Sequence, residues 1–460
     1  MRVDRLALLL APWLGGAPAY AAVATGLRGL ALDGRLPVGS RVPSERALAV
    51  ALGLSRTTVT AAYDVLRGEG YLRSDYGAGS AVALPGARPA GPDDQPGDRP
   101  AVLDLSVAAL PAPAALVHAV HEATHKLRPM LAGHGLHPLG VPALREAIAD
   151  HLTGRGLRTT PDQVLVTAGA LHGWNLVLTA LGRVGSRVLV EQPTYPAVLD
   201  AVSAHRLRAT PMPVGPAGWD LPVAPGGLVH LTPDGQNPTG FSATALQRRD
   251  LVRWATGGTL VVDETFADLT LNGRPVRPLG AFDQHAITLG SMSKAFWAGL
   301  RLGWVRAEPD LLRRLTQARG AQDLASPVLE QLVATELLHA AEGVLTERRA
   351  GLRASRDALI AALRDALPAW SFVRPDAGMV LWVDLGGLSS TRLAGHALDL
   401  GLRLTPGPRF TVDGTADGLL RLPFTLPVAQ VPQLVELLKE AGARAGTRAV
   451  ASRLPSRWTA

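Results

Sequence analysis

The chain has 460 residues, of which 47% are hydrophobic and 18% charged, and it carries a formal charge of +7. This balance is typical of a folded protein and excludes a largely disordered chain, while the length predicts two to four domains. Because the sequence contains no cysteine, disulfide bonds, thiolate metal sites and cysteine nucleophiles are excluded. The positive charge is compatible with nucleic-acid binding but does not establish it, and we expect no metal site.

The first segment of the chain resembles a short secretory leader, because an apolar run at 6–10 is followed by Ala-Tyr-Ala at 19–21. However, Asp4 lies where a leader would be basic, and Pro12 interrupts the apolar stretch. The run is also too short to span a bilayer. We therefore expect these residues to form the first packed segment of a cytoplasmic protein without a membrane span.

Two short helices joined by a glycine turn are predicted in the N-terminal part of the chain. Ser44 and Ser55 are their expected N-caps, and the second helix spans Arg56 to Gly68. They follow a longer amphipathic helix at 20–32 and precede a β-hairpin at 70–82. This order is that of a helix-turn-helix followed by a wing. Small hydroxyls and an arginine at the start of the second helix can reach phosphates and base edges in the major groove of DNA.

This module resembles the winged-helix domain of GntR-type regulators. The resemblance is carried by Gly-Arg-Leu-Pro-Val-Gly-Ser-Arg-Val-Pro-Ser-Glu-Arg at 34–46, Leu-Ser-Arg-Thr-Thr-Val at 54–59 and Glu-Gly-Tyr-Leu at 69–72. It implies that six residues face DNA, namely Arg46, Ser55, Arg56, Thr57, Thr58 and Gly77. Thr60 stands where a further basic residue is frequent in the family, so fewer phosphate contacts are expected. A winged helix used only for protein contact is the alternative.

The remainder of the chain predicts a linker followed by a larger domain. Residues 85–100 are rich in proline and glycine and cannot build a core. From about residue 101 onward, apolar strand candidates alternate with helical segments, which predicts an α/β domain with a mostly parallel sheet. We therefore predict a DNA-binding domain at 1–84, an α/β domain at 101–445 and a flexible tail at 446–460.

Lys294 follows an apolar run at 286–290 that predicts a buried strand. A lysine just past a strand end, among hydroxyls and glycines, can be desolvated and lose its proton. The neutral amine is the form that condenses with an aldehyde to give a Schiff base. Ser291, Ser293 and the guanidinium of Arg301 would suit a phosphate on the aldehyde-bearing molecule. Taken alone, the Ser-Lys pair is equally compatible with a lysine in a surface loop.

Four further segments place polar groups after predicted strands, where ligands of a parallel sheet bind. Gly169-Ala170 offers free amides at a helix start, which hold anions, and Tyr195 offers an aromatic face. Asn237 lies in an Asn-Pro-Thr-Gly turn, and Asp263 ends an apolar run. Taken singly, these features indicate an ordinary turn, a packed tyrosine and a helix cap. Their joint occurrence along the chain favours a single site.

In this order, together with Ser-x-Ser-Lys and Gly-Leu-Arg, the segments resemble the fold-type-I pyridoxal-phosphate enzymes of the aminotransferase class I/II family over roughly 103–440. The resemblance implies that Lys294 binds pyridoxal 5'-phosphate covalently, that Asp263 pairs with the protonated pyridine nitrogen, and that Asn237 donates to the phenolic oxygen. Tyr195 would stack on the ring. The implied phosphate ligands are Gly169, Ala170, Ser291, Ser293 and Arg301.

Three positions refine this resemblance. Arg421, in Leu-Arg-Leu-Pro-Phe, matches the family's substrate-carboxylate arginine, with a structural ion pair as the alternative. Phe266 occupies the place of a tyrosine that usually hydrogen-bonds to the cofactor oxygen. His134 replaces a tyrosine that in relatives reaches the phosphate across the dimer. Neither of the last two changes forbids cofactor binding, but both argue against efficient transamination.

A GntR-type winged helix joined to an aminotransferase-like domain resembles the MocR subfamily of transcriptional regulators. This implies a cytoplasmic homodimer that binds a double-stranded DNA operator. Pyridoxal 5'-phosphate, alone or with an amine or amino-acid effector, would shift the equilibrium between two dimer arrangements that hold the winged helices differently. The alternative is a working aminotransferase with an accessory DNA-binding domain. A third hypothesis, a regulator with a cofactor-free ligand cleft, is disfavoured by the joint presence of Lys294, Asp263 and Asn237.

Overall fold

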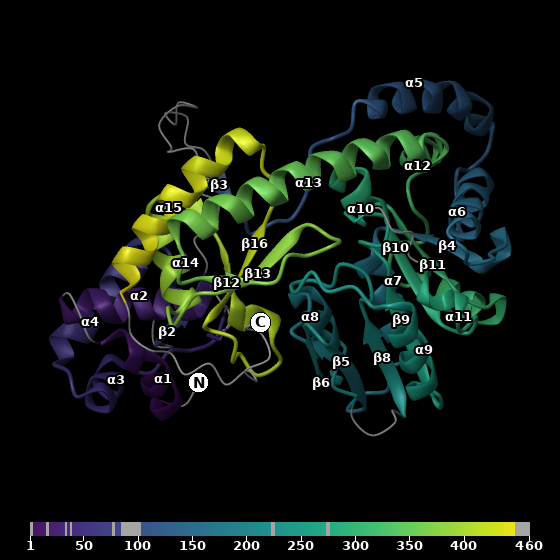
Figure 1. Ribbon diagram of the computed structural model, residues 1–460. Helices are drawn as coiled ribbons and strands as arrows, with labels where there is room; N and C mark the ends of the chain where they lie inside the picture. Colours follow the sequence, from purple (N-terminus) through teal and green to yellow (C-terminus); the bar gives the residue numbers. More distant parts are fainter. Residues whose placement is uncertain are drawn as a thin grey trace.

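Figure 1 shows the computed structural model of the chain, which describes residues 3–14, 18–32, 35–36, 39–75, 79–83, 103–221, 226–272 and 277–446. The predicted linker at 85–100, most of the predicted tail and Gly77 of the predicted wing lie outside these residues. No helix within the described ranges is both long and apolar enough to cross a membrane.

The N-terminal module consists of α1 (Val3–Leu10), η1 (Ala11–Trp13), α2 (Ala19–Leu32), α3 (Glu45–Leu52), α4 (Arg56–Gly68) and the antiparallel hairpin of β1 (Leu72–Asp75) and β2 (Gly79–Val82). The hydroxyls of Ser44 and Ser55 each accept a hydrogen bond from the backbone amide three residues further on, so both predicted N-caps are confirmed. Leu6 and Leu10 are fully buried in the core of this module. The leader-like apolar run is therefore part of a packed domain.

An eight-stranded sheet forms the centre of the next part of the chain, in the order β4-β11-β10-β9-β8-β5-β6-β7. Its strands are β4 (Val164–Thr167), β5 (Arg187–Gln192), β6 (Arg208–Gly215), β7 (Gly218–Trp219), β8 (Gly227–Leu231), β9 (Gly258–Asp263), β10 (Ile287–Ser291) and β11 (Gly303–Arg306). The run from β10 to β6 is parallel throughout, and only β11 and β7 run in the opposite direction. The predicted mostly parallel sheet is confirmed.

Helices cover both faces of this sheet (Figure 1). On β5, Val188 and Val190 pack in one cluster with α7 (Ala170–Leu181), α8 (Pro196–Ala204) and α11 (Pro309–Arg319), whereas Leu189 packs in another with α9 (Ala245–Trp254). Burial on both faces explains why the central strands read as continuous apolar runs in the sequence. The other helices of this part are α5 (Ala115–Leu127), α6 (Pro142–Gly154), α10 (Met292–Ala295) and α12 (Val328–His339).

The long helix α13 (Ala341–Ala366) leads from this part to a smaller C-terminal part (Figure 1). There a four-stranded sheet has the order β12-β13-β16-β15. Its elements and the two helices of this part are β12 (Ser371–Phe372), β13 (Val380–Asp384), β15 (Thr405–Pro406), β16 (Leu419–Pro423), α14 (Ser390–Asp399) and α15 (Val431–Ala445). A parallel pair of β14 (Leu402–Arg403) and β3 (Leu103–Asp104) joins the start of the domain to this part.

The N-terminal module docks on the C-terminal part through α2 and α14, which lie against each other. Arg28 Nη1 lies 3.8 Å from Asp399 Oδ1, and Arg35 Nη2 donates a hydrogen bond to Thr391 Oγ1 at 2.9 Å. The start of α4 takes no part in these contacts and is exposed, including Arg56. The module is thus attached to the C-terminal part through α2, while the start of α4 stays accessible to a binding partner.

Candidate functional site

A pocket of about 290 Å³ lies beyond the carboxyl ends of β4, β5, β8, β9 and β10. All ten residues that the sequence predicted for the cofactor and effector line it: Gly169, Ala170, Tyr195, Asn237, Asp263, Ser291, Ser293, Lys294, Arg301 and Arg421. They come from segments up to 252 residues apart, from Gly169 to Arg421. The parallel topology brings them together because the ends of parallel strands meet at one edge of the sheet.

Lys294 lies in the short helix α10, which begins directly after β10 and is capped by the Ser291 hydroxyl. Its Nζ donates a hydrogen bond to the Ala108 carbonyl at 2.6 Å. Burial, reinforced by the positive charge of Arg421, lowers the pKa of Lys294 to about 8. A substantial fraction of this amine is therefore neutral near physiological pH, as a nucleophilic amine must be.

Asp263, the last residue of β9, faces the same pocket from the neighbouring strand. Its Oδ1 accepts a hydrogen bond from the Thr265 amide at 2.9 Å, which fixes the orientation of the carboxylate. Phe266 also lines the pocket, and its ring centroid lies 6.0 Å from Lys294 Nζ. At this position the pocket gains a hydrophobic wall in place of a hydroxyl group.

The loop that carries Asn237 is held by a buried carboxylate, Glu191, at the end of β5. Glu191 accepts hydrogen bonds from the Thr232 amide at 3.0 Å, from Trp219 Nε1 at 2.9 Å and from Gln236 Nε2 at 3.1 Å. Burial raises the pKa of Glu191 to about 7, and these hydrogen bonds act against that effect. Because Gln236 directly precedes Asn237, this network positions the asparagine at the pocket.

The start of α7 forms a cradle of backbone amides on another side of the pocket. Gly169 has a φ of 97°, a conformation that glycine adopts at little steric cost. Arg301, which lies in the left-handed region itself, donates from Nη2 to the Ala168 carbonyl at 3.3 Å. The hydroxyl of Ser291 accepts from the Ser293 amide at 3.2 Å. Free amides at a helix start, hydroxyls and a guanidinium together suit a phosphate group.

Arg421 lies in β16, at the side of the pocket formed by the C-terminal part. Its Nη2 donates to the Ser106 carbonyl, and its guanidinium carbon lies 5.1 Å from the Phe410 ring centroid. Burial lowers the pKa of Arg421 to about 10. Among the described residues, its Nε has no hydrogen-bond partner. A buried guanidinium that lines a pocket is suited to binding a carboxylate.

The sequence did not predict His230 and Trp174 as part of this site. Their rings meet edge to face at 4.8 Å, both line the pocket, and both are buried. Neither ring nitrogen of His230 has a hydrogen-bond partner within the described part of the chain. Burial lowers the pKa of His230, and nearby Asp263 opposes this effect. The available signal was a histidine within an otherwise apolar strand, β8.

These residues fit pyridoxal 5'-phosphate. Two pocket oxygens, Asn237 Oδ1 and Thr265 Oγ1, are buried without a hydrogen-bond partner among the described residues, and buried polar atoms are ordinarily paired. The donor set matches the parts of the cofactor: an amine of lowered pKa for the aldehyde, a carboxylate for the pyridinium, and amides, hydroxyls and a guanidinium for the phosphate.

His134, in contrast, does not line the pocket. It is exposed, and its Nδ1 accepts a hydrogen bond from the Leu136 amide at 3.0 Å.

On the N-terminal module, the predicted DNA-facing residues gather at the start of α4 and on α3. Arg46, Ser55, Arg56 and Thr57 are exposed, and Thr58 is half-buried. The Ser55 hydroxyl lies 2.8 Å from the hydroxyls of both Thr57 and Thr58. By contrast, the hydroxyl of Thr60 donates to Glu45 Oε2 at 2.8 Å, so this side chain is engaged within the module.

Fold and pocket define an aminotransferase-like protein that carries a winged helix at its N-terminus. Comparison with known proteins gives the same result. The chain belongs to the aminotransferase class I and II family, which matches residues 100–438, and residues 19–82 match the gntR family of bacterial regulatory proteins. This combination is the organisation of the MocR subfamily of GntR-type regulators.

The similar proteins include transcriptional regulators and an aminotransferase. The uncharacterized HTH-type transcriptional regulator YisV of Bacillus subtilis is 26% identical over 86% of this chain and 89% of its own length. The HTH-type pyridoxine biosynthesis transcriptional regulator PdxR of Corynebacterium glutamicum is 33% identical over 71% of this chain and 74% of its own length. Among solved structures, the α-aminoadipate aminotransferase LysN of Thermus thermophilus, complexed with N-(5'-phosphopyridoxyl)-L-leucine, superposes with a TM-score of 0.69 and 28% identity, covering 75% of this chain and 92% of LysN.

Proposed function

We propose that this chain is a cytoplasmic transcriptional regulator that binds an operator through its winged helix and pyridoxal 5'-phosphate through Lys294. The observation that carries the proposal is the coexistence, in one chain, of an exposed α4 start and a pocket that contains the half-buried Lys294. The names of the relatives support both halves, since PdxR is a transcriptional regulator and LysN is complexed with a phosphopyridoxyl amino acid.

Each pocket residue has a task that its position supports. Lys294 supplies the amine for covalent attachment, and Asp263 holds a proton on the pyridine nitrogen. Asn237 binds the phenolic oxygen, Tyr195 covers the ring, and the amides of α7 with Ser291, Ser293 and Arg301 bind the phosphate. When bound, the cofactor supplies an aldehyde and an electron-poor ring. Arg421 would bind the carboxylate of an amino-acid effector, so that effector and cofactor meet in one pocket.

Arg421 also provides a connection between the pocket and the N-terminal module. It lies in β16, which follows Asp417; this carboxylate accepts hydrogen bonds from the Ser389 hydroxyl at 2.8 Å and the Thr391 amide at 3.0 Å at the start of α14. The helix α14 in turn contacts α2 of the DNA-binding module. Occupation of Arg421 can therefore bias the docking of the module through a short chain of contacts.

Homodimerisation is part of this proposal. Four exposed apolar side chains lie on α5 and the segment after it, namely Val117, Val120, Leu131 and Leu136. An apolar group of this kind on a folded surface favours association, and a dimer suits an operator with two half-sites. Sedimentation equilibrium should give a dimer for the full chain and a monomer for Val117→Asp combined with Leu131→Asp. A monomeric unmodified protein at micromolar concentration would contradict the proposal.

The central test measures operator affinity of the full chain at fixed salt, with and without pyridoxal phosphate. We expect the cofactor to change the dissociation constant for the operator in the unmodified protein but not in Lys294→Ala, which should also lack the near-visible absorbance of bound cofactor. An operator affinity that is indifferent to pyridoxal phosphate would contradict the effector role.

A second candidate function, amino-group transfer, is favoured by Arg421 and by the similarity to LysN. Single-turnover absorbance with a series of amino acids distinguishes the two, because a physiological aminotransferase converts its cofactor rapidly. Phe266 argues for the regulator, since the pocket lacks a hydroxyl at that wall.

A further inference from the structure

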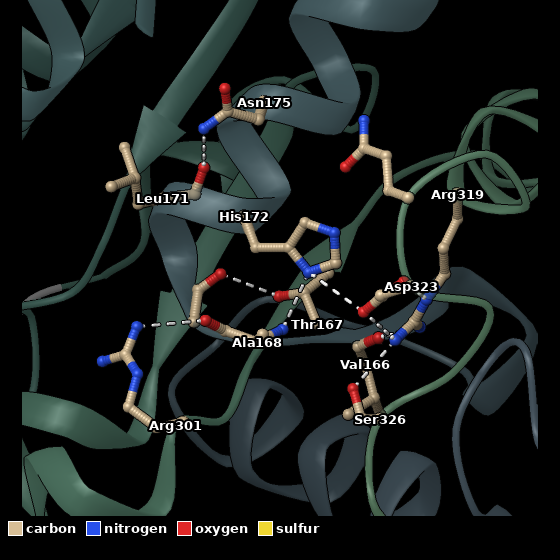
Figure 2. Close-up of polar contacts among 12 residues, drawn as sticks. Val166, Thr167, Ala168, Leu171, His172, Asn175, Arg301, Arg319, Asp323 and Ser326 are labelled. Carbon is tan, nitrogen blue, oxygen red and sulfur yellow. Dashed lines mark hydrogen bonds and ion pairs between the residues drawn. The ribbon is translucent and has the colours of Figure 1, made fainter. Parts of the chain in front are cut away.

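His172, in the first turn of α7, contacts the backbone of the phosphate-binding loop from behind. Its Nδ1 accepts a hydrogen bond from the Ala168 amide at 3.0 Å, and Figure 2 shows the imidazole between this amide and Asp323. The histidine reaches this amide because helical side chains point toward the N-terminus of their helix, which places residue i beside residue i−4. It does not line the pocket itself.

The loop is held at three successive points (Figure 2). His172 binds the amide of Ala168, and Arg301 binds its carbonyl. Because the Ala168 carbonyl and the Gly169 amide belong to one planar peptide, the bond from Arg301 sets the direction of that amide. In the same way, the Thr167 hydroxyl donates to the Gly169 carbonyl at 3.0 Å and sets the direction of the following amide. Gly169 and Ala170, which carry these two amides, both line the pocket.

Only a neutral His172 can fill this role, since Nδ1 accepts a hydrogen bond when it carries no proton. Burial lowers the pKa of His172, and the positive charge of Arg319 acts in the same direction. Two groups oppose them and raise this pKa: Asp323, whose Oδ2 lies 3.7 Å from Nδ1, and the side chain of Gln322. The pull of Asp323 is reduced because Arg319 donates to both of its oxygens, at 2.7 Å and 3.0 Å.

We propose that His172 is a positioning residue for the cofactor phosphate: its neutral Nδ1 holds Ala168, so that the amides of Gly169 and Ala170 point into the pocket. Protonation places a hydrogen on Nδ1, which can then no longer accept a hydrogen bond from the Ala168 amide. The new N–H donor turns toward Asp323 instead. The loop is then released, and affinity for the phosphorylated cofactor falls on acidification. This inference rests on the proposed binding of pyridoxal phosphate.

Two variants of the full chain separate the acceptor from the volume of the side chain. His172→Asn keeps an acceptor on the atom bonded to Cγ, whereas His172→Leu fills similar space without one. Dissociation constants for pyridoxal phosphate and for pyridoxal, which lacks the phosphate, are measured by absorbance. We expect His172→Leu to bind pyridoxal phosphate about tenfold more weakly and pyridoxal within about twofold of the unmodified protein, and His172→Asn to bind both nearly normally.

Equal loss of affinity for pyridoxal and pyridoxal phosphate, or unchanged binding by His172→Leu, would overturn the inference. If the unmodified protein binds neither compound, the proposed function fails instead, so the two failures are distinguishable.

The pH dependence is tested with the unmodified protein and His172→Asn alone, so this test remains possible if His172→Leu does not fold. Titration of Lys294 and of the cofactor phosphate affects the unmodified protein and His172→Asn alike. We therefore expect the ratio of their affinities for pyridoxal phosphate to change between pH 7 and pH 5, with the unmodified protein losing more. A ratio that is independent of pH across the range in which both proteins stay folded would refute the release of the loop by protonation of His172.

Discussion

The lowered pKa of Lys294 predicts how fast this residue captures pyridoxal phosphate as a function of pH. Only the neutral amine attacks an aldehyde. With the pKa lowered from 10.5 to about 8, about one-tenth of Lys294 is neutral at pH 7, against about three in ten thousand for an ordinary lysine. The pocket thus raises the reactive fraction about 300-fold at pH 7.

The sign of the pH dependence follows from the same shift. Protonated Lys294 is unreactive, so the rate of capture should rise about tenfold for each pH unit below 8 and level off above it. Stopped-flow absorbance at near-visible wavelengths measures this rate for the apo protein mixed with excess pyridoxal phosphate. A rate that is constant from pH 6 to pH 9, or that rises up to pH 10, would refute the reasoning.

A pair of charge variants tests the cause of the shift. Arg421 is the positive charge that contributes most to lowering the pKa of Lys294 after burial itself. Arg421→Gln should therefore move the midpoint of the capture profile to higher pH. The matched control, Arg374→Gln, removes the same charge from a half-exposed surface arginine outside the pocket and should leave the midpoint unchanged.

Three further predictions concern the DNA-binding face, a helix cap and the backbone of the pocket. Arg56→Ala should weaken operator binding about tenfold and lower the slope of log affinity against log salt concentration by about one, as measured by fluorescence anisotropy. The control is Arg313→Ala at an exposed arginine of α11, which should leave operator binding unchanged. Ser55→Ala removes the cap of α4 and should lower the free energy of unfolding by about 1 kcal/mol in denaturant titration; an unchanged value would show that the cap is redundant. At Gly303, an added Cβ would lie 2.4 Å from the Gly290 carbonyl oxygen and 2.7 Å from Gly169 Cα. Gly303→Ala should therefore lower the free energy of unfolding by about 2 kcal/mol or more and weaken cofactor binding. The control Gly343→Ala, whose Cβ would meet no neighbouring atom within 4 Å, should do neither.

Much of the local structure follows from residues whose preferences are short-range. Ser44 and Ser55 precede helical runs and were predicted as N-caps, because a hydroxyl at that place satisfies a backbone amide of its own helix. The central strands were predicted from unbroken apolar runs, such as that of β10. The pocket residues were predicted from a resemblance in their order along the chain.

Other features depend on contacts that no local pattern encodes. His172 and Asp323 are separated by 151 residues, and only the packing of α7 against α11 and the loop after it places them 3.7 Å apart. Similarly, the edge-to-face ring contact of His230 is made with Trp174, which comes from another element. Long-range pairs of this kind were missed because single histidines carry no periodic signal.

The sequence by itself determined the two modules, their helix caps, the apolar strands and the position of Lys294 after a strand, because each depends on neighbouring residues or on a fixed motif. Only the tertiary structure decided the pKa of Lys294, the direction of the loop amides and the docking of α2 on α14. Desolvation and charge act through space, and their strength depends on which distant segments the fold brings within a few ångströms.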